Sequence, residues 1–104
     1  MKTTTNFKSL ILKKVNNLMG IAINFTNQDD DYSTEWWDVH EFAEDAADFF
    51  LNDETTINKE ELITKMEQMK SYAEKFSTPE FESVKDEWHE VKLLAQMVEY
   101  GSAD

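Results

Sequence analysis

Cysteine and arginine are missing from the sequence, and glycine and proline are nearly so. The 104 residues contain two glycines and one proline, and all ten basic residues are lysines. Without cysteine the chain can form neither a disulfide framework nor a thiolate zinc site, and we expect it in a reducing compartment, the cytoplasm. The scarcity of glycine and proline argues against a turn-rich β-sandwich and favours long helices with few breaks.

Long apolar runs are also lacking. No stretch approaches the roughly 18 to 20 apolar residues that a membrane helix needs. The short apolar run at residues 10–12 is interrupted by Lys13 and Lys14, and no small-residue cleavage pattern follows it. We therefore expect neither a membrane-spanning segment nor an export signal. With 40% apolar residues, residues 1–104 are expected to form one domain, with residues 1–5 frayed.

Negative charge dominates the chain and is unevenly distributed. The formal net charge at pH 7 is −12. Residues 1–28 carry four lysines and no acid, whereas residues 29–104 carry all 22 acids and six lysines. Self-repulsion of this size is tolerated where it serves solubility, steering or recognition of a basic partner. It opposes direct binding to nucleic acid or to an anionic membrane, because both need positive charge.

Apolar residues recur at helical spacing in four segments, which predicts an all-α fold, a small bundle of about four helices. Asn58 followed by Glu61 resembles a capping box at the start of the third segment. Thr78 and Pro79 suit the N-cap and first position of the fourth. The predicted helices span residues 6–19, 33–51, 58–76 and 79–101.

The stretch between the first two predicted helices is expected to be different. Gly20 offers the first helix a stop. The β-branched run 21–25 is compatible with an extended segment or with a continuation of the helix, and we favour the extended segment. Residues 27–33 contain three consecutive aspartates and no periodicity, which predicts an exposed loop. Residues 20–33 are therefore expected to be extended or irregular.

The acids of the second predicted helix form the candidate binding surface. Glu41, Asp45 and Asp48 fall at i, i+4 and i+7, so their carboxylates repeat about every 5 to 6 Å along one face. Phosphates along a nucleic-acid strand are spaced comparably, so this face can occupy the lysine and arginine sites of a DNA-binding protein. The alternative is that the acids only keep the helix surface solvated. The predicted partner-binding residues are Asp29, Asp30, Asp31, Asp38, Glu41, Glu44, Asp45, Asp48 and Trp37.

Trp37 is the predicted anchor of this acidic face. Trp36 and Trp37 are adjacent, so in a helix their side chains diverge by about 100° and cannot share one core position. An exposed aromatic side chain beside carboxylates is typical of a protein-binding hot spot. The alternative is that Trp37 covers residues 21–25 as ordinary core.

Metal sites and catalytic sites are not expected. His40 with Glu44, and Asp86 with His89, offer one pair of metal ligands each at helical spacing. The ferritin-like pattern of two Glu-x-x-His pairs with further carboxylates is absent. The chain also has no glycine-rich phosphate loop, no serine elbow and no recognisable triad. We therefore expect no enzyme activity, no metal and no cofactor.

In size, acidity and helical character the chain resembles phage- and mobile-element-encoded inhibitors that mimic DNA, such as anti-CRISPR and anti-restriction proteins. The resemblance implies a non-enzymatic inhibitor of a basic, nucleic-acid-handling protein, and a nuclease immunity protein would share these features. The alternative is a helical structural or regulatory adaptor, or a homodimer, that binds through apolar helix faces. We expect Lys8, Lys13 and Lys14 to pair with acids of the second and fourth helices or to contact a second copy.

Overall fold

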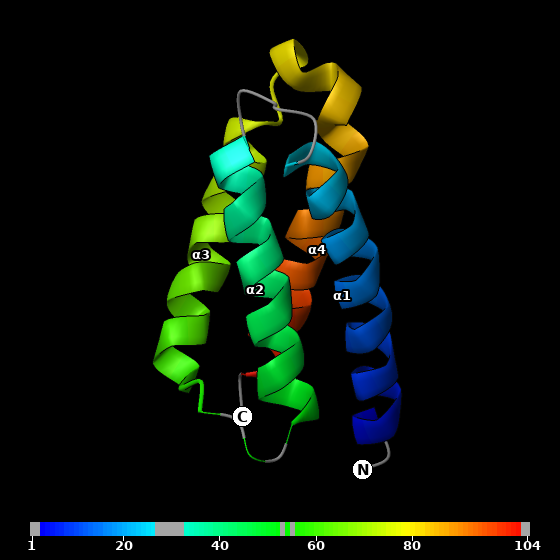
Figure 1. Ribbon diagram of the computed structural model, residues 1–104, viewed down its shortest axis with the longest axis vertical. Coiled ribbons are helices and arrows are strands. Elements are labelled where there is room, and N and C mark those ends of the chain that lie inside the picture. Colours follow the sequence, from blue (N-terminus) through cyan, green and yellow to red (C-terminus); the bar gives the residue numbers. More distant parts are fainter. Residues whose placement is uncertain (1–2, 27–32, 53, 55, 103–104) are drawn as a thin grey trace.

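Four amphipathic α-helices build the molecule, as the apolar spacing predicts. The computed structural model describes residues 3–26, 33–52, 54 and 56–102. Within these ranges it contains four α-helices, one 3-10 helix and no strand, which confirms the all-α fold class (Figure 1). The elements in chain order are α1 (Thr3–Thr26), α2 (Ser33–Leu51), α3 (Lys59–Lys75), η1 (Pro79–Val84) and α4 (Lys85–Gly101).

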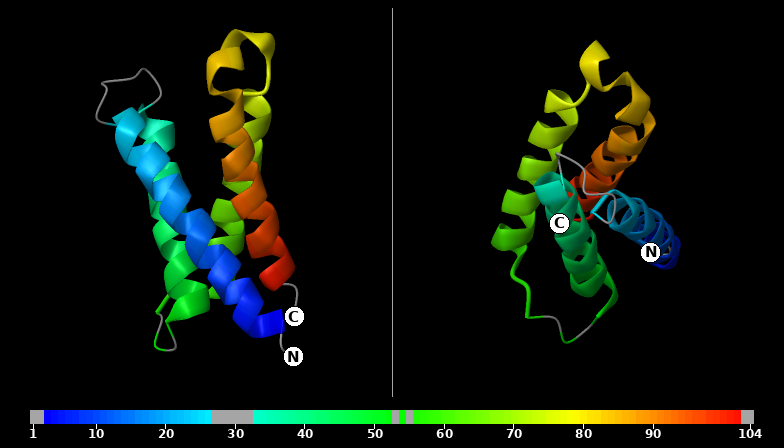
Figure 2. Two further views of the ribbon diagram at one scale, coloured as in Figure 1. Left: turned by 90° about the vertical axis from the view of Figure 1, so that its right-hand side faces the viewer. Right: turned by 45° about the horizontal axis from the view of Figure 1, so that its top comes forward.

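The helices are arranged as two antiparallel hairpins. α1 packs most extensively on α2, and α3 packs most extensively on α4. Figure 1 shows α1, α2 and α3 side by side, with α4 behind them, and Figure 2 shows the two hairpins from the side. The bundle measures 42 × 23 × 22 Å. Because the α1–α2 hairpin packs with one side on the other hairpin, its opposite side faces away from α4.

Each helix buries one apolar stripe along its inner side. These positions recur every three or four residues, which brings them to one side of a helix with 3.6 residues per turn. Burying a large apolar side chain contributes about 1.5–3 kcal/mol, so the stripes supply most of the stabilisation. The buried stripes are Ile11, Val15, Leu18 and Ala22 in α1; Trp36, Val39, Phe42, Ala43 and Ala46 in α2; Leu62, Met66, Met69 and Ala73 in α3; and Trp88, Val91, Leu94, Ala95 and Val98 in α4.

A column of aromatic rings joins all four helices at the end where α1 finishes and α2 begins. Phe25 of α1 stacks on Trp36 of α2 with ring centroids 4.7 Å apart. Trp36 lies 4.3 Å from Trp88 of α4. Trp88 in turn stacks at 4.5 Å on Phe76, the C-cap of α3, and Phe81 of η1 meets Phe76 edge-on at 4.7 Å. Such pairs contribute about 0.5–1.5 kcal/mol each beyond the area they bury.

The course of α1 differs from the prediction. Residues 3–5 lie in the first turn of α1, and the fraying of residues 1–5 stays a prediction. The extended or irregular segment is wrong for residues 20–26, because the helix continues through Gly20 to its end. Residues 27–32, the remainder of the predicted loop before α2, lie outside the described residues.

The reason for the continuation is tertiary packing beyond the glycine. Ala22 is fully buried, and Phe25 takes its place in the aromatic column. Both side chains stay on the inner side only if the helical period is kept through Gly20. These contacts offset the roughly 1 kcal/mol that a glycine costs in a helix interior.

The start of the third helix is confirmed, and the start of the fourth is only partly so. The Asn58 side chain accepts a 2.8 Å hydrogen bond from the backbone amide of Glu61. Thr78 and Pro79 take the N-cap and first positions as predicted, but the six residues that follow the cap form a 3-10 helix. Phe81 is non-helical there, with φ −110° and ψ 27°. Regular α-helix resumes only at α4, and the kink brings the Phe81 ring to the aromatic column.

Alanine at the two glycines tests this account of α1 and of its packing. Gly20→Ala should raise the free energy of unfolding by up to about 1 kcal/mol, because alanine favours helix and nothing lies within 4 Å of its Cβ. Gly101→Ala should lower it by about 1–3 kcal/mol, because its Cβ would overlap the Phe7 ring and stand 2.9 Å from Phe50 Cε1. Urea denaturation measures both. A loss of stability in Gly20→Ala would contradict the continuous helix.

Candidate functional site

The direction of Trp36 determines which side of α2 faces solvent. Trp36 enters the aromatic column and is 2% exposed, whereas Trp37, the next residue, is 57% exposed. Positions 4, 7 and 11 residues after Trp37 lie on the same side of the helix. They are Glu41, Glu44 and Asp48. We call Trp37 and these three acids the outer ridge of α2.

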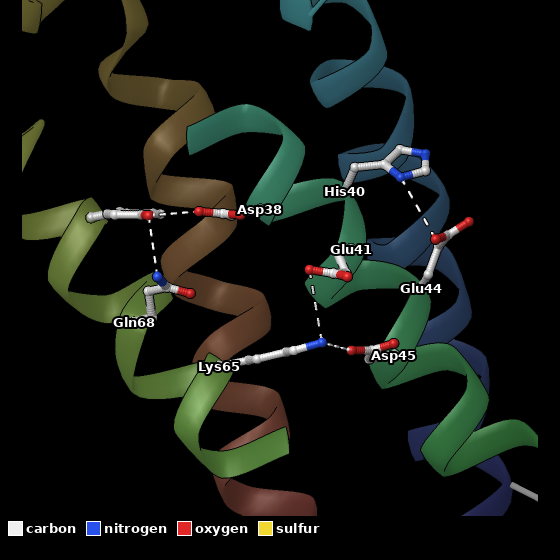
Figure 3. Close-up of polar contacts among 8 residues, drawn as sticks. Asp38, His40, Glu41, Glu44, Asp45, Lys65 and Gln68 are labelled. Carbon is white, nitrogen blue, oxygen red and sulfur yellow. Dashed lines mark hydrogen bonds and ion pairs between the residues drawn. The ribbon is translucent and has the colours of Figure 1, made fainter. Parts of the chain in front are cut away.

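Two of the three ridge carboxylates, those of Glu41 and Glu44, make only long contacts with other side chains. Glu44 Oε1 lies 3.8 Å from His40 Nδ1, and Glu41 Oε1 lies 3.9 Å from Lys65 Nζ (Figure 3). The Glu44 and Glu41 side chains are 57% and 64% exposed. Asp48 Oδ1 accepts a 2.8 Å hydrogen bond from Asn52 Nδ2 one turn further on. Exposed ion pairs such as those of Glu41 and Glu44 contribute little stability, so a partner can compete for these two carboxylates.

Two of the predicted binding residues lie instead on the edge of α2 that faces α3. Asp38 Oδ2 accepts a 2.7 Å hydrogen bond from Tyr72 Oη. Asp45 Oδ2 is bound by Lys65 Nζ, and its side chain is only 20% exposed (Figure 3). The structure therefore separates Asp38 and Asp45 from the outer ridge. The remaining predicted residues, Asp29, Asp30 and Asp31, lie outside the described residues.

The sequence analysis did not identify the two α3 side chains that bind Asp38 and Asp45. Lys65 and Tyr72 are seven residues apart and so lie on one edge of α3, beside the buried stripe. Tyr72 Oη also accepts a 3.2 Å hydrogen bond from Gln68 Nε2. Their spacing was the available signal, but the sequence does not say which helix faces that edge.

Both α3 side chains have shifted pKa values. Burial raises the pKa of Tyr72 to about 12, and the hydrogen bond to Asp38 acts in the same direction. The hydrogen bond to Asp45 raises the pKa of Lys65, and burial of its ammonium only partly opposes this rise. The polar contacts between α2 and α3 are therefore present when Tyr72 is neutral and Lys65 is charged.

The predicted pairing of the α1 lysines with acids of other helices is found for one of them. Lys14 Nζ lies 2.7 Å from Glu90 Oε1 of α4, which confirms the expected pairing with the fourth helix for this lysine. Lys8 and Lys13 are exposed. α1 thus keeps an outward basic character while α2 beside it is acidic.

A groove of 860 Å³ lies on the far side of the molecule, between α3 and α4. Its base is formed by Ala73, Phe76 and Trp88, which are nearly inaccessible. Three lysines and three acids line it, so its charge is balanced. The charged lining residues are Lys70, Lys85, Lys92, Glu67, Glu74 and Asp86. The groove lacks the one-sided charge of the outer ridge.

The histidines do not form a metal site together. His40 lies beside Glu44 and meets the Trp37 ring edge-on at 5.8 Å, whereas His89 lines the groove between α3 and α4. Across the described ranges, no three His, Cys, Asp or Glu side chains come together as a metal-binding group. Among the helices described, none is both long enough and apolar enough to cross a membrane.

No protein-family model matches the chain, and comparisons with curated proteins and with solved structures find no match either.

Removing the Tyr72 hydroxyl tests the contact between α2 and α3. Tyr72→Phe should lower the free energy of unfolding at neutral pH by about 1 kcal/mol, because the hydrogen bond to Asp38 is lost. The raised pKa of Tyr72 also stabilises the fold below pH 10, and this contribution is lost as the pH rises from 10 to about 12. Stability should therefore fall less steeply over that range in the variant. Chemical denaturation at several pH values measures the difference.

The matched control is Tyr100→Phe, because Tyr100 is 74% exposed and lies away from Asp38. It should reproduce the pH dependence of the native chain. Identical stability profiles for Tyr72→Phe and the native chain would contradict the assigned role of the hydroxyl.

Proposed function

We propose that the protein is a cytoplasmic, non-enzymatic acidic binding protein that inhibits a basic, nucleic-acid-handling protein. It would do so by occupying the surface that such a protein offers to DNA or RNA. The observation that carries the proposal is the outer ridge, which sets three carboxylates and one indole on the solvent side of a single helix.

The spacing of the ridge acids supports this kind of target. Glu41, Glu44 and Asp48 are separated along the helix axis by about 4.5 and 6 Å, at 1.5 Å per residue. A rigid helix holds these carboxylates in a row, much as a nucleic-acid strand holds its phosphates. Lysines and arginines arranged to grip phosphates would meet them without a large rearrangement.

The charge around the ridge supports fast and selective association. α2 carries six acids and no lysine. A one-signed field of this kind steers a basic partner toward the ridge and repels acidic proteins. Trp37 would add an apolar anchor at one end of the row, where loss of water strengthens the neighbouring ion pairs.

A helical adaptor that binds through apolar faces is the second candidate. Leu12 and Ile23 of α1 favour it, because both are nearly half exposed. Salt distinguishes the two candidates: a complex held by the acidic ridge weakens steeply as ionic strength rises, whereas an apolar interface does not.

Charge reversal on the ridge tests the proposed function. The native chain, immobilised, should capture basic nucleic-acid-binding proteins from a lysate of the cells that make it, and both moderate salt and added duplex DNA should release them. The variant Glu41→Lys, Glu44→Lys, Asp48→Lys should lose these proteins, because the carboxylates that contact them are gone. Mass spectrometry of the eluates identifies what is captured, and a nuclease assay then measures inhibition directly.

The control variant carries the same change of charge elsewhere. Glu67→Lys, Glu74→Lys and Glu80→Lys replace three exposed acids of α3 and η1. This variant should capture as the native chain does, because the ridge is intact. Equal capture by the ridge variant, or captured proteins that DNA does not displace, would refute the proposal. Partners that survive high salt would favour the adaptor instead.

A further inference from the structure

The outward side of the α1–α2 hairpin carries a strip of exposed apolar side chains beside the outer ridge. Leu12 is 46% exposed, Ile23 is 44% exposed and Trp37 is 57% exposed. Met19, partly buried, stands between the two α1 residues at helical spacing, so the three share one side of α1. An apolar strip of this kind marks an interaction surface more often than isolated exposed residues do.

Two ring contacts fix how the two helices are aligned. Phe25 stacks on Trp36 at one end, with centroids 4.7 Å apart, and Phe7 meets Phe50 at the other, with centroids 5.3 Å apart. Because the helices are antiparallel, Ile23 lies level with the start of the ridge. Residue 8, next to Phe7, lies level with its acidic end.

Exposed lysines flank the α1 part of the strip, and acids lie along α2 beside it. Lys8 lies about 40° and Lys13 about 100° around the helix from Leu12, in opposite directions. α1 contributes lysines and no acid, and of these Lys8 and Lys13 are exposed. α2 contributes six acids and no lysine. A basic partner matches α2 alone, whereas a partner that covers both helices meets charges of both signs. A surface with an acidic edge opposite α1 and a basic edge opposite α2 matches both helices.

We infer that a second copy of this chain covers the outward side of the α1–α2 hairpin, in a dimer where α1 of each copy lies against α2 of the other. A two-fold axis parallel to the helices produces this arrangement, because it exchanges the two edges and keeps every residue at its own level. Ile23 then faces the start of the second copy's ridge. Lys8 faces the acidic end of that ridge.

The available area suits such a dimer. A molecule 42 Å long and 22–23 Å across presents a broad side on the order of 900 Å², and a standard stable interface buries about 800 Å² on each partner. The apolar strip would form the dry centre of this interface, and the charged edges would form its rim.

The dimer does not depend on the proposed function, although it uses the same ridge. A basic partner and the second copy would compete for Glu41, Glu44 and Asp48. Changes confined to α1 therefore distinguish the two proposals, because they affect the dimer and leave the ridge intact.

A charge exchange between two variants tests the arrangement. One variant carries Glu41→Lys, Glu44→Lys and Asp48→Lys, so both of its edges are basic. The other carries Lys8→Glu and Lys13→Glu, so the exposed charges of its α1 are negative like those of its α2. By sedimentation analysis over a concentration series, the native chain should dimerise, and each variant alone should dimerise at least about tenfold more weakly. An equimolar mixture should recover a heterodimer, since each edge again meets its opposite.

Several outcomes would overturn the inference. They are a native chain that stays monomeric at the highest concentration reached, variants that dimerise as the native chain does, and a mixture that remains monomeric. The last of these would show that α1 does not lie against α2 of the second copy.

The apolar strip is tested by a matched pair of substitutions in α1. Leu12→Gln with Ile23→Gln should weaken the dimer at least about tenfold, because the centre of the interface becomes polar. Leu10→Gln should leave it unchanged, since Leu10 is 53% exposed but lies about 160° around the helix from Leu12. Circular dichroism checks that both variants fold. Equal dimerisation in the two variants would contradict the assigned face, and capture of a basic protein by the Leu12→Gln, Ile23→Gln variant reports on the proposed function alone.

Discussion

The stacking of Trp36 between Phe25 and Trp88 is the interaction on which the rest of the structure depends. It holds α1, α2 and α4 at one end, and through Phe76 it reaches the end of α3. It also fixes the rotation of α2 about its own axis. With Trp36 inside, Trp37 must point outward, and the acids at helical spacing from it point outward as well. A packing contact in the core thus decides which charges the surface presents.

The same rotation divides the acids of α2 into two groups with different surroundings. Asp38 and Asp45 turn toward α3. There Tyr72 donates a hydrogen bond to Asp38, and the charge of Lys65 offsets that of Asp45. On the outer ridge, the Glu41 and Glu44 side chains are 64% and 57% exposed, so most of their charge stays in contact with water. Because some acids of α2 are paired with α3 and others are not, one side of α2 stays available for recognition. The basic α1 beside that side favours a second copy of the chain as the partner.

The sequence predicts the helices well because their apolar spacing is local and regular. It does not predict that α1 continues past Gly20, because glycine weakens the helix locally while the compensating contacts of Phe25 come from another helix. Periodicity also places Glu44 and Asp45 almost equally well on one acidic side. The two residues differ because Lys65 binds Asp45 and not Glu44. Lys65 lies twenty residues further along the chain, and a single sequence does not show that α3 brings it next to Asp45. The divergence of Trp36 from its neighbour, by contrast, follows from the helical period alone.

Quenching of tryptophan fluorescence in dilute solution tests most directly whether the core column turns a negatively charged ridge outward. Trp36 and Trp88 are each 2% exposed and should be protected from dissolved ions, whereas Trp37 should be quenched. Caesium should quench it more effectively than iodide, because the neighbouring carboxylates attract cations and repel anions. Neutralising the ridge with Glu41→Gln, Glu44→Gln and Asp48→Asn should remove that preference. Equal quenching of all three indoles, or equal efficiency of the two ions in the native chain, would contradict the account.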